Sequence, residues 1–262
     1  MRGRLSRWAR VAADLLLVWL AAGLVAPRLS AAARRRLGRR LARRNLAALE
    51  LRVRVRGTPS PEPVLLVANH VSWLDVHALG AVVPARFVAK AETARWPIVG
   101  TIARRLDAFF IVRGSFRDAA RVKARVAAAL RAGERVAVFP EGTTTDGSRI
   151  GRFHGALLQA ALDADVPVQP VAVRYRAADG TPGTAAAFVG DMTFAESLAR
   201  VVRAPGLVAE LWFGPPLAPA GCSRRELAAV ARETIADVLG LPAAARAPQP
   251  PARRSAAFRL AG

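Results

Sequence analysis

The chain has 262 residues, 53% of them hydrophobic, and its 40 Lys and Arg against 19 Asp and Glu give a formal net charge of +21. This length suits one α/β domain with short extensions, and this hydrophobic content excludes a wholly disordered chain. The single cysteine, Cys222, excludes an internal disulfide and a multi-cysteine metal site. The positive charge favours polyanionic partners, namely nucleic acid, an anionic membrane surface or an acidic carrier protein.

An apolar segment lies near the amino terminus. Residues 15–27 carry no charge, Asp14 interrupts the apolar stretch near its start, and several arginines precede it. The segment is shorter than the about 20 apolar residues that a membrane-spanning helix needs. It is a retained anchor or half-buried interfacial helix, a cleaved secretory signal, or a helix of the core, and we favour the first.

A run of arginines follows this segment. Seven of the eleven residues from 34 to 44 are arginine. Such a run is either a solvated helix face or a surface that contacts anionic lipid. Because the apolar segment precedes it, we favour lipid contact and predict that residues 1–50 form a helical arm associated with the membrane.

Short strands and longer helices are predicted beyond the arm. Residues 51–56 alternate between polar and apolar, as a half-exposed strand does, and residues 64–68 form a continuous apolar run, as a buried strand does. Similar runs follow at 86–89, 108–112, 135–139, 168–173 and 207–213. Helical patterns separate several of these runs, and the capping signals at Ser115 and Ser223 mark two helix starts.

This alternation predicts a single α/β domain with a central, mostly parallel sheet flanked by helices. We assign residues 51–240 to this domain. Residues 241–262 are rich in Ala, Pro and Arg, a composition typical of a disordered tail.

The strand at 64–68 leads directly into His70. Ligands of α/β proteins collect at the carboxyl ends of strands, so His70 lies where an active site is expected. Asp75 follows five residues later and could hold the imidazole in one tautomer, as the aspartate of a serine-hydrolase triad does. No enzyme serine is needed if the hydroxyl of the substrate attacks. The structural alternative is a helix-capping histidine with a solvated carboxylate.

A second loop follows the strand at 135–139. Residues 139–143 read Phe-Pro-Glu-Gly-Thr, a tight turn whose backbone N–H groups can receive an anion or a developing oxyanion. Glu141 has the wrong charge for an anion site, so we expect it to fix the loop by hydrogen bonds or to hold a positively charged neighbour. The alternative is an ordinary loop rich in turn residues.

Four blocks now stand in order along the chain. They are Asn-His-x-x-x-x-Asp at 69–75, Phe-x-x-Arg at 110–113, Phe-Pro-Glu-Gly-Thr at 139–143 and Val-Pro-Val-Gln-Pro at 166–170. Together they resemble the glycerolipid acyltransferase family, typified by bacterial 1-acyl-sn-glycerol-3-phosphate acyltransferases of the PlsC type. Four ordered blocks are far more specific than any one of them.

The resemblance implies transfer of a fatty acyl group from acyl-CoA or acyl-carrier protein to a lysolipid hydroxyl, without a metal or another cofactor. His70 would be the general base, Asp75 would orient it, and Arg113 would bind the anionic head group of the acceptor. The acceptor site would be completed by Asn69, Glu141, Gly142 and Thr143. Because the donor is cytosolic, the resemblance also implies the cytoplasmic face of the inner membrane, with an anionic lipid surface as a partner.

One departure from the family concerns the acceptor. Phosphate-specific members commonly carry arginine directly after Phe-Pro-Glu-Gly-Thr, and this chain has Thr144. The residues that follow resemble a subgroup that includes lyso-ornithine lipid acyltransferases. Arg149 and Arg152 are alternative sources of the missing charge. Because either arginine could replace the missing charge, 1-acyl-sn-glycerol-3-phosphate stays the expected acceptor, giving phosphatidic acid. Lyso-ornithine lipid is the alternative.

Two other classes of protein were weighed. The net charge fits a nucleic-acid-binding protein, but no motif of that class is found and aromatic residues are only 6%. A secreted hydrolase would need a nucleophile motif such as Gly-x-Ser-x-Gly, which the chain lacks. We expect no nucleic-acid partner, and structural roles for the other histidines, His77 and His154.

Overall fold

A seven-stranded sheet organises the computed structural model, which describes residues 2–112 and 114–241. The strands are β1 (Arg52–Arg56), β2 (Leu65–Ala68), β3 (Arg86–Lys90), β4 (Phe109–Ile111), β5 (Val136–Val138), β6 (Val168–Arg176) and β7 (Val208–Phe213). The α-helices are α1 (Arg2–Leu20), α2 (Ala31–Ala48), α3 (Leu74–Val82), α4 (Val99–Arg105), α5 (Phe116–Arg131), α6 (Gln159–Ala164), α7 (Phe194–Arg203) and α8 (Arg224–Leu239). Short helical turns complete the chain at η1 (Ala21–Val25), η2 (Ala26–Arg28), η3 (Ala91–Arg95) and η4 (Thr184–Ala186).

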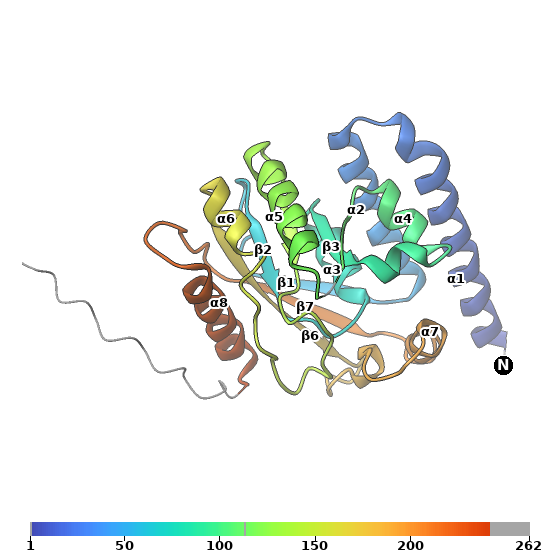
Figure 1. Cartoon of the computed structure of the whole chain (residues 1–262). Helices are drawn as coiled ribbons and strands as arrows, with labels where there is room; N and C mark the ends of the chain where they lie inside the picture. Colours follow the sequence, from blue (N-terminus) through green and yellow to red (C-terminus); the bar gives the residue numbers. More distant parts are fainter. Residues whose placement is uncertain (1, 113, 242–262) are drawn as a thin grey trace, which may run out of the picture.

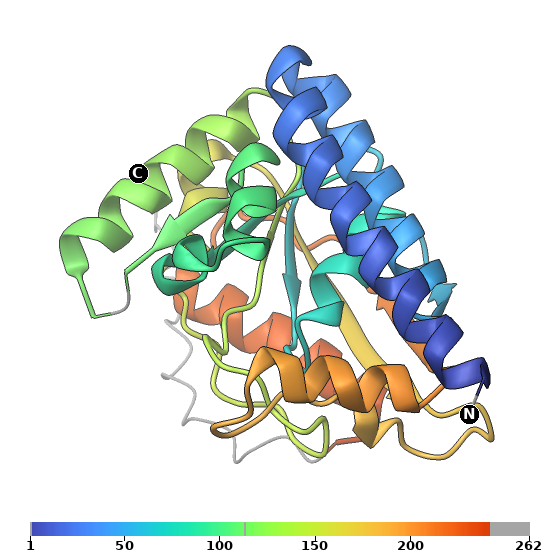
Figure 2. The ribbon, with the colours of Figure 1, turned by 90° about the vertical axis from the view of Figure 1, so that its right-hand side faces the viewer.

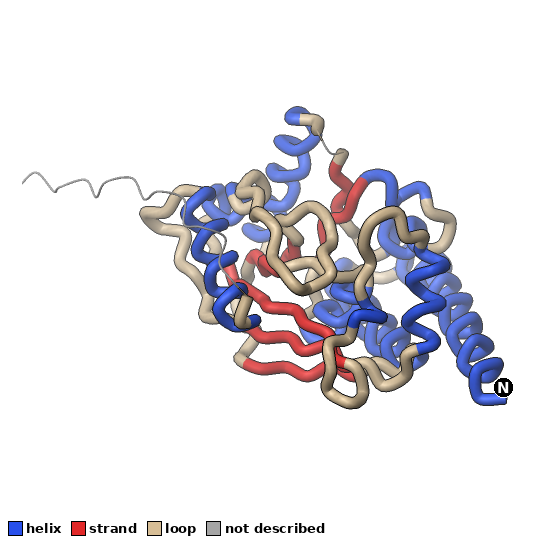
Figure 3. The backbone as a smooth tube through the Cα atoms, turned by 90° about the horizontal axis from the view of Figure 1, so that it is seen from below, coloured by secondary structure: helices blue, strands red, loops and turns tan. Residues whose placement is uncertain are grey.

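The order of the strands is β1-β7-β6-β2-β5-β3-β4. Among the described residues, neighbouring strands run parallel except for the antiparallel pair β6 and β7. This confirms the mostly parallel α/β fold. The carboxyl ends of β2, β5 and β6 therefore lie side by side at the same end of the strands. Figure 3 shows loops gathered on that side of the molecule.

Helices cover both faces of the sheet (Figure 1). The four-residue strand β2 shows why its sequence is continuously apolar. Leu66 and Ala68 point into the cluster with α2, α3 and α7, whereas Leu65 and Val67 point into the cluster with α5, α6 and α8. A strand buried on both faces needs apolar side chains at every position. Full burial of each large aliphatic side chain contributes about 1.5–3 kcal/mol.

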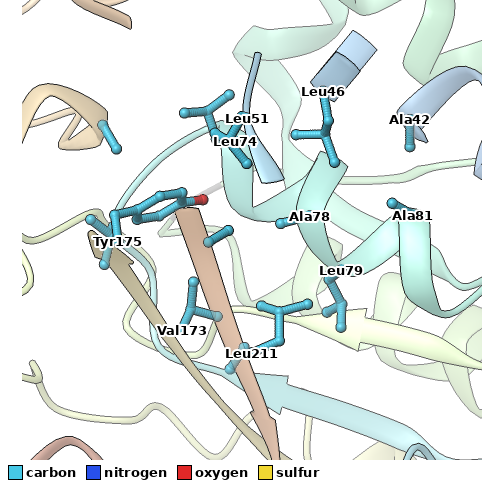
Figure 4. Close-up of a cluster of buried hydrophobic side chains, with 14 of the residues drawn as sticks. Ala42, Leu46, Leu51, Leu74, Ala78, Leu79, Ala81, Val173, Tyr175 and Leu211 are labelled. Carbon is cyan, nitrogen blue, oxygen red and sulfur yellow. The ribbon is translucent and has the colours of Figure 1, made fainter. Parts of the chain in front are cut away.

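The first of these clusters fixes α3 against the sheet. Leu74, Ala78 and Leu79 lie on α3 and face Val173 of β6 and Leu211 of β7 (Figure 4). The helix that carries Asp75 and follows the turn at His70 is thus held by apolar packing along its length.

Strand β1 lies at the edge of the sheet, and within the described part of the chain β7 is its only hydrogen-bonded neighbour. The predicted alternating strand is confirmed. Its valine side is not fully covered, however, and Val55 is 42% exposed. An edge strand receives cover from one side only. Its exposed arginines discourage pairing with another chain, because unpaired edge strands are templates for aggregation.

The amino-terminal arm is an antiparallel pair formed by α1 and α2, and α1 lies along the outside of the molecule (Figure 2). Val11 and Val18 of α1 are buried, but Leu16 and Leu24 are 56% and 60% exposed. The helical run Ser6–Arg28 has 23 residues and is long and apolar enough to cross a membrane, because the helix extends beyond the uncharged segment 15–27 at both ends. The outward apolar face does not fit a helix of the core.

Asp14, which interrupts the apolar stretch, faces inward. Its carboxylate is 3% exposed and lies 2.7 Å from the guanidinium Nε of Arg44 on α2. Burial raises the pKa of this carboxyl, and the charge of Arg44 opposes that rise. The outer face of α1 therefore stays free of this charge.

The arginine run bonds mostly to the protein itself. Five of its seven side chains contact carboxylates or carbonyl oxygens of the chain: Arg34 with Asp107, Arg35 with Glu134, Arg39 and Arg43 with the Ala81 carbonyl, and Arg44 with Asp14. The remaining two, Arg36 and Arg40, are exposed. The run thus attaches α2 to the domain, while Arg43 and Arg44 are exposed as well as Arg36 and Arg40, so these four arginines are left for the predicted lipid contact.

The capping signals are confirmed in part. Ser223 and Glu226 form a full capping box at the start of α8. Ser115 accepts a hydrogen bond from the Asp118 N–H at the start of α5, but the Asp118 carboxylate accepts from the Val112 N–H. Of the predicted tail at 241–262, all but the first residue lies outside the described residues.

Candidate active site

The turn between β2 and α3 brings His70 and Asp75 together. His70 Nδ1 lies 2.8 Å from Asp75 Oδ2. Because a carboxylate oxygen only accepts, Nδ1 carries the hydrogen and Nε2 is the nitrogen left to act as a base. The expected pairing is present, and the catalytic roles of the two residues stay predictions.

Asp75 is fully buried, which excludes the solvated carboxylate considered from the sequence. Its Oδ2 also accepts hydrogen bonds from the N–H groups of Val71, at 2.8 Å, and Ser72, at 3.0 Å. It lies in the first turn of α3, where the helix dipole favours a negative charge. The carboxylate is therefore fixed by main-chain groups of the same turn that carries His70.

Tyr175 is a member of this network that sequence reasoning missed. Its hydroxyl donates to Asp75 Oδ1 at 2.6 Å. Burial, and then the charge of Asp75, raise the pKa of this phenol well above its ordinary value, so it stays a protonated donor. The available signal was weak: Tyr175 is the only tyrosine of the chain and lies two residues beyond the predicted strand 168–173.

Asn69 has a different task from the predicted substrate contact. It is buried, its Nδ2 donates to the Val173 carbonyl at 2.9 Å, and its Oδ1 accepts from the Val173 N–H at 2.7 Å. Both ends of the amide are thus occupied by the main chain of β6. Asn69 joins the end of β2 to the strand that carries Tyr175.

Glu141 holds two loops by their main chains. Its Oε1 accepts from the His70 N–H at 2.8 Å, and its Oε2 accepts from the Gly151 N–H at 2.7 Å. Burial raises the pKa of the carboxyl, and these two hydrogen bonds oppose the rise. This confirms the prediction that Glu141 fixes the loop by hydrogen bonds.

The same loop holds His70 from two further sides. The Thr145 N–H donates to the His70 carbonyl at 2.8 Å. The Phe139 ring stacks on the imidazole with 4.2 Å between ring centroids. His70 is therefore fixed at its N–H, its carbonyl and one face of its ring.

Gly142, which is half-buried, and Thr143 follow Glu141 in this turn. Gly142 has φ of 68°, a left-handed conformation that glycine adopts without strain, and its N–H donates to the Phe139 carbonyl. Thr143 is exposed. Their contacts with an acceptor stay predictions.

Thr144 donates from its hydroxyl to the Phe188 carbonyl, which ties the loop to the segment before α7. The residue that replaces the family arginine is thus a structural contact. Arg149 and Arg152, the alternative sources of positive charge, are exposed.

Arg113, predicted to bind the head group of the acceptor, lies outside the described residues. The strand β4, which ends two residues before it, is at the edge of the sheet and is separated from β2 by β5 and β3.

The other histidines lie apart from this network. His77 is half-buried on α3, its ring meets Trp73 edge-on at 5.6 Å, and burial lowers its pKa to about 4. His154 is exposed. Among residues 2–112 and 114–241, no group of three or more His, Cys, Asp and Glu could hold a metal ion.

The fold and the site define an α/β protein that carries a His–Asp pair with a buried aspartate, at the carboxyl ends of the strands of a mostly parallel sheet. The acyltransferase family model matches residues 52–174. A lyso-ornithine lipid O-acyltransferase of Pseudomonas aeruginosa is 42% identical over 202 residues, which cover 77% of this chain and 78% of that protein. The chain belongs to the acyltransferase family, as the four blocks predicted.

Two further comparisons agree. A 1-acyl-sn-glycerol-3-phosphate acyltransferase of Neisseria meningitidis is 43% identical over 138 residues, which cover 52% of this chain and 54% of that protein. The crystal structure of the 1-acyl-sn-glycerophosphate acyltransferase PlsC of Thermotoga maritima covers 92% of this chain and 97% of its own, with a TM-score of 0.58 at 23% identity. At that identity the structural likeness supports the fold alone.

Proposed function

We propose that this chain transfers a fatty acyl group from a thioester donor, acyl-CoA or acyl-carrier protein, to the hydroxyl of a lysolipid. The observation that carries the proposal is the 2.8 Å contact between His70 Nδ1 and the fully buried Asp75 carboxylate. This contact leaves Nε2 as the base, and the main chain of His70 is held by Glu141 and Thr145.

The chemistry proceeds by direct attack. His70 Nε2 takes the proton of the acceptor hydroxyl while its oxygen forms a bond to the thioester carbonyl carbon. The tetrahedral intermediate collapses, the carbon–sulfur bond breaks, and the leaving thiolate takes the proton from His70. Asp75 stabilises the imidazolium between the two proton transfers.

A positioned general base contributes about 10²- to 10⁴-fold, so positioning of the two substrates supplies the rest. We assign that positioning to the turn at Gly142 and Thr143, and to Arg113 for an anionic head group. A planar guanidinium binds a carboxylate or a phosphate with two parallel hydrogen bonds.

We propose lyso-ornithine lipid as the acceptor. Two observations support it. The lyso-ornithine lipid acyltransferase of P. aeruginosa aligns over 78% of its length, and Thr144 replaces a phosphate-gripping arginine with a hydroxyl bound to the Phe188 carbonyl. The carboxylate of ornithine would still suit a guanidinium.

Lysophosphatidate, the first expectation from the sequence, becomes the second candidate. Its support is the 43% identity to the N. meningitidis 1-acyl-sn-glycerol-3-phosphate acyltransferase. The exposed Arg149 and Arg152 would then supply the charge for the phosphate.

The amino-terminal helix Ser6–Arg28 could anchor the protein to a membrane. We propose the cytoplasmic face of the inner membrane, because both candidate donors are cytosolic molecules. The outward leucines of α1 would enter the lipid.

Parallel assays test the proposal. Purified protein in vesicles of phosphatidylethanolamine and phosphatidylglycerol receives labelled acyl-CoA or acyl-carrier protein, with lyso-ornithine lipid or lysophosphatidate as the acceptor. We expect product from at least one donor, and a higher kcat/KM for lyso-ornithine lipid. A higher kcat/KM for lysophosphatidate would reverse the choice of acceptor, and no product from any combination would contradict the function.

A further inference from the structure

We propose that Tyr175 is a positioning residue that controls how strongly Asp75 acts on His70. This inference rests on the proposed function, in which His70 is the general base. It extends the catalytic pair to a chain of three side chains, His70, Asp75 and Tyr175, drawn from two separate parts of the sequence.

The two oxygens of Asp75 have different partners. Oδ2 accepts from His70 Nδ1 and from two main-chain N–H groups of the turn. Oδ1 accepts from the hydroxyl of Tyr175 at 2.6 Å, the shortest of these contacts. Figure 4 shows the hydroxyl of Tyr175 directed from β6 towards the start of α3. Tyr175 thus holds the side of the carboxylate that the turn does not reach.

A hydrogen bond to Oδ1 changes what His70 experiences. A short hydrogen bond from a neutral donor to a carboxylate is charge-assisted, and it stabilises negative charge on the oxygen that accepts it. Negative charge drawn to Oδ1 is withdrawn from Oδ2, the oxygen that faces His70. Tyr175 therefore restrains the carboxylate in orientation and moderates its effect on the imidazole.

The turn that carries His70 also helps to fix the position of the Tyr175 hydroxyl, through Asn69. Asn69 binds both main-chain groups of Val173, two residues before Tyr175 on the same face of β6. The residue that precedes the catalytic histidine therefore sets the register of the strand that supplies Tyr175.

Few other charged side chains among the described residues lie near His70, Asp75 and Tyr175. Glu141 faces His70 through the His70 N–H, and its carboxylate is also near Asp75. Arg174 and Arg176, the neighbours of Tyr175 on β6, pair with Glu210, at 2.9 and 3.7 Å. Alternate side chains of a strand point to opposite faces, so these arginines lie across the sheet from Asp75.

Two changes at Tyr175 should move the acid limb of the kcat/KM profile in opposite directions. Tyr175→Phe removes the donor, so more charge remains on Oδ2 and the imidazolium is favoured. We expect the acid limb of the kcat/KM profile to move up by about half to one pH unit. We also expect kcat at the plateau to fall about tenfold, with little change in KM, because the carboxylate is less restrained.

The reverse change is available because Tyr175 is the only tyrosine in the chain. Growth on 3-fluorotyrosine replaces this side chain alone with a more acidic phenol, which is a stronger donor. The acid limb should then move to lower pH by a few tenths of a unit.

Ser197→Ala is the matched control for lost packing. Its buried hydroxyl accepts from Trp73 Nε1 at 3.0 Å and does not touch Asp75. This variant should lose a buried hydrogen bond and leave the acid limb in place.

The outcomes separate this inference from the proposed function. His70→Ala is assayed beside the other variants, and only its inactivity supports the general base. If His70→Ala is inactive but the fluorotyrosine protein and Tyr175→Phe keep the wild-type acid limb, Tyr175 is merely structural and the inference is overturned. If Tyr175→Phe does not fold, the fluorotyrosine protein alone decides, since an unshifted acid limb there overturns the inference.

Discussion

The turn that carries His70 and the amino-terminal arm each have a buried aspartate, and the contacts of the two carboxylates differ. Asp75 has no exposed surface and accepts four hydrogen bonds, from two N–H groups, an imidazole and a phenol. Asp14, 3% exposed, faces a single cation, Arg44. Similar burial therefore serves two ends: the first network fixes the direction of one side chain, and the second keeps a charge off the outer face of an apolar helix.

The turn with His70 and helix α1 of the arm also differ in how much of their surroundings is protein. The histidine of the turn is held at its N–H, its carbonyl and one face of its ring by the loop that contains Glu141. Helix α1 packs by one face and leaves leucines outside. We therefore expect changes in the turn to affect turnover and changes in the arm to affect membrane binding, with little exchange between the two.

The largest effect should come from the turn. Asp75→Asn places an amide where His70 Nδ1 and two N–H groups need an acceptor, so it favours the wrong tautomer of the histidine. We expect kcat to fall about 10³- to 10⁴-fold, as for the equivalent change in a serine protease triad. Sedimentation with vesicles should match wild type, and turnover within tenfold of wild type would contradict the orienting role.

The next effect should come from the arm. Leu16 and Leu24 are exposed on α1, and insertion of each leucine into lipid would be worth about 1.5–3 kcal/mol. The double variant Leu16→Glu, Leu24→Glu should therefore partition into vesicles at least about a hundredfold more weakly. Turnover of an acceptor dispersed in detergent should stay near wild type. Unchanged sedimentation with vesicles would show that α1 does not enter the membrane.

A third effect concerns α3, on which Asp75 lies. Burial lowers the pKa of His77 from its ordinary value of 6.5 to about 4. The unfolded chain therefore takes up this proton first as pH falls, and the folded state should lose up to about 3 kcal/mol of stability between pH 6.5 and 4.

Substitution of His77 tests this loss. His77→Gln cannot take up the proton, so its free energy of unfolding, measured with urea, should fall less steeply across the same pH range. Equal slopes for the variant and wild type would show that His77 does not set the acid sensitivity.

The smallest effect should come from Asp14. Its pKa is raised, so the folded state favours the protonated form, and wild-type stability falls as pH rises above the ordinary value of 3.8. Asp14→Asn removes this titration and should make the protein slightly more stable at neutral pH. A less stable variant at neutral pH would show that the ion pair with Arg44 outweighs the cost of burial.

Local patterns predicted the strands and the His–Asp pair, because each depends on residues close together in sequence. The partners that come from far away could not be predicted in this way. Tyr175 meets Asp75 across 100 positions, and the pairing of β2 with β6 sets that contact. Likewise Arg35 contacts Glu134 across 99 positions, so the sequence did not show that the arginine run also binds the protein itself.

The main-chain contacts of Asn69 could not be predicted from the sequence for a related reason. The sequence shows it beside His70, which suggested a contact with substrate. Its partner is the main chain of Val173, and no side-chain pattern in β6 reports on a main-chain partner.

Replacement of His70 tests the general base most directly. His70→Ala and wild type are compared at equal concentration in the same vesicles, with labelled thioester donor and lysolipid, and His77→Gln controls for loss of a histidine. We predict that His70→Ala loses at least about a hundredfold in acyl transfer while its vesicle binding and urea unfolding match wild type. Acyl transfer by folded His70→Ala within tenfold of wild type would contradict the proposal that His70 is the base.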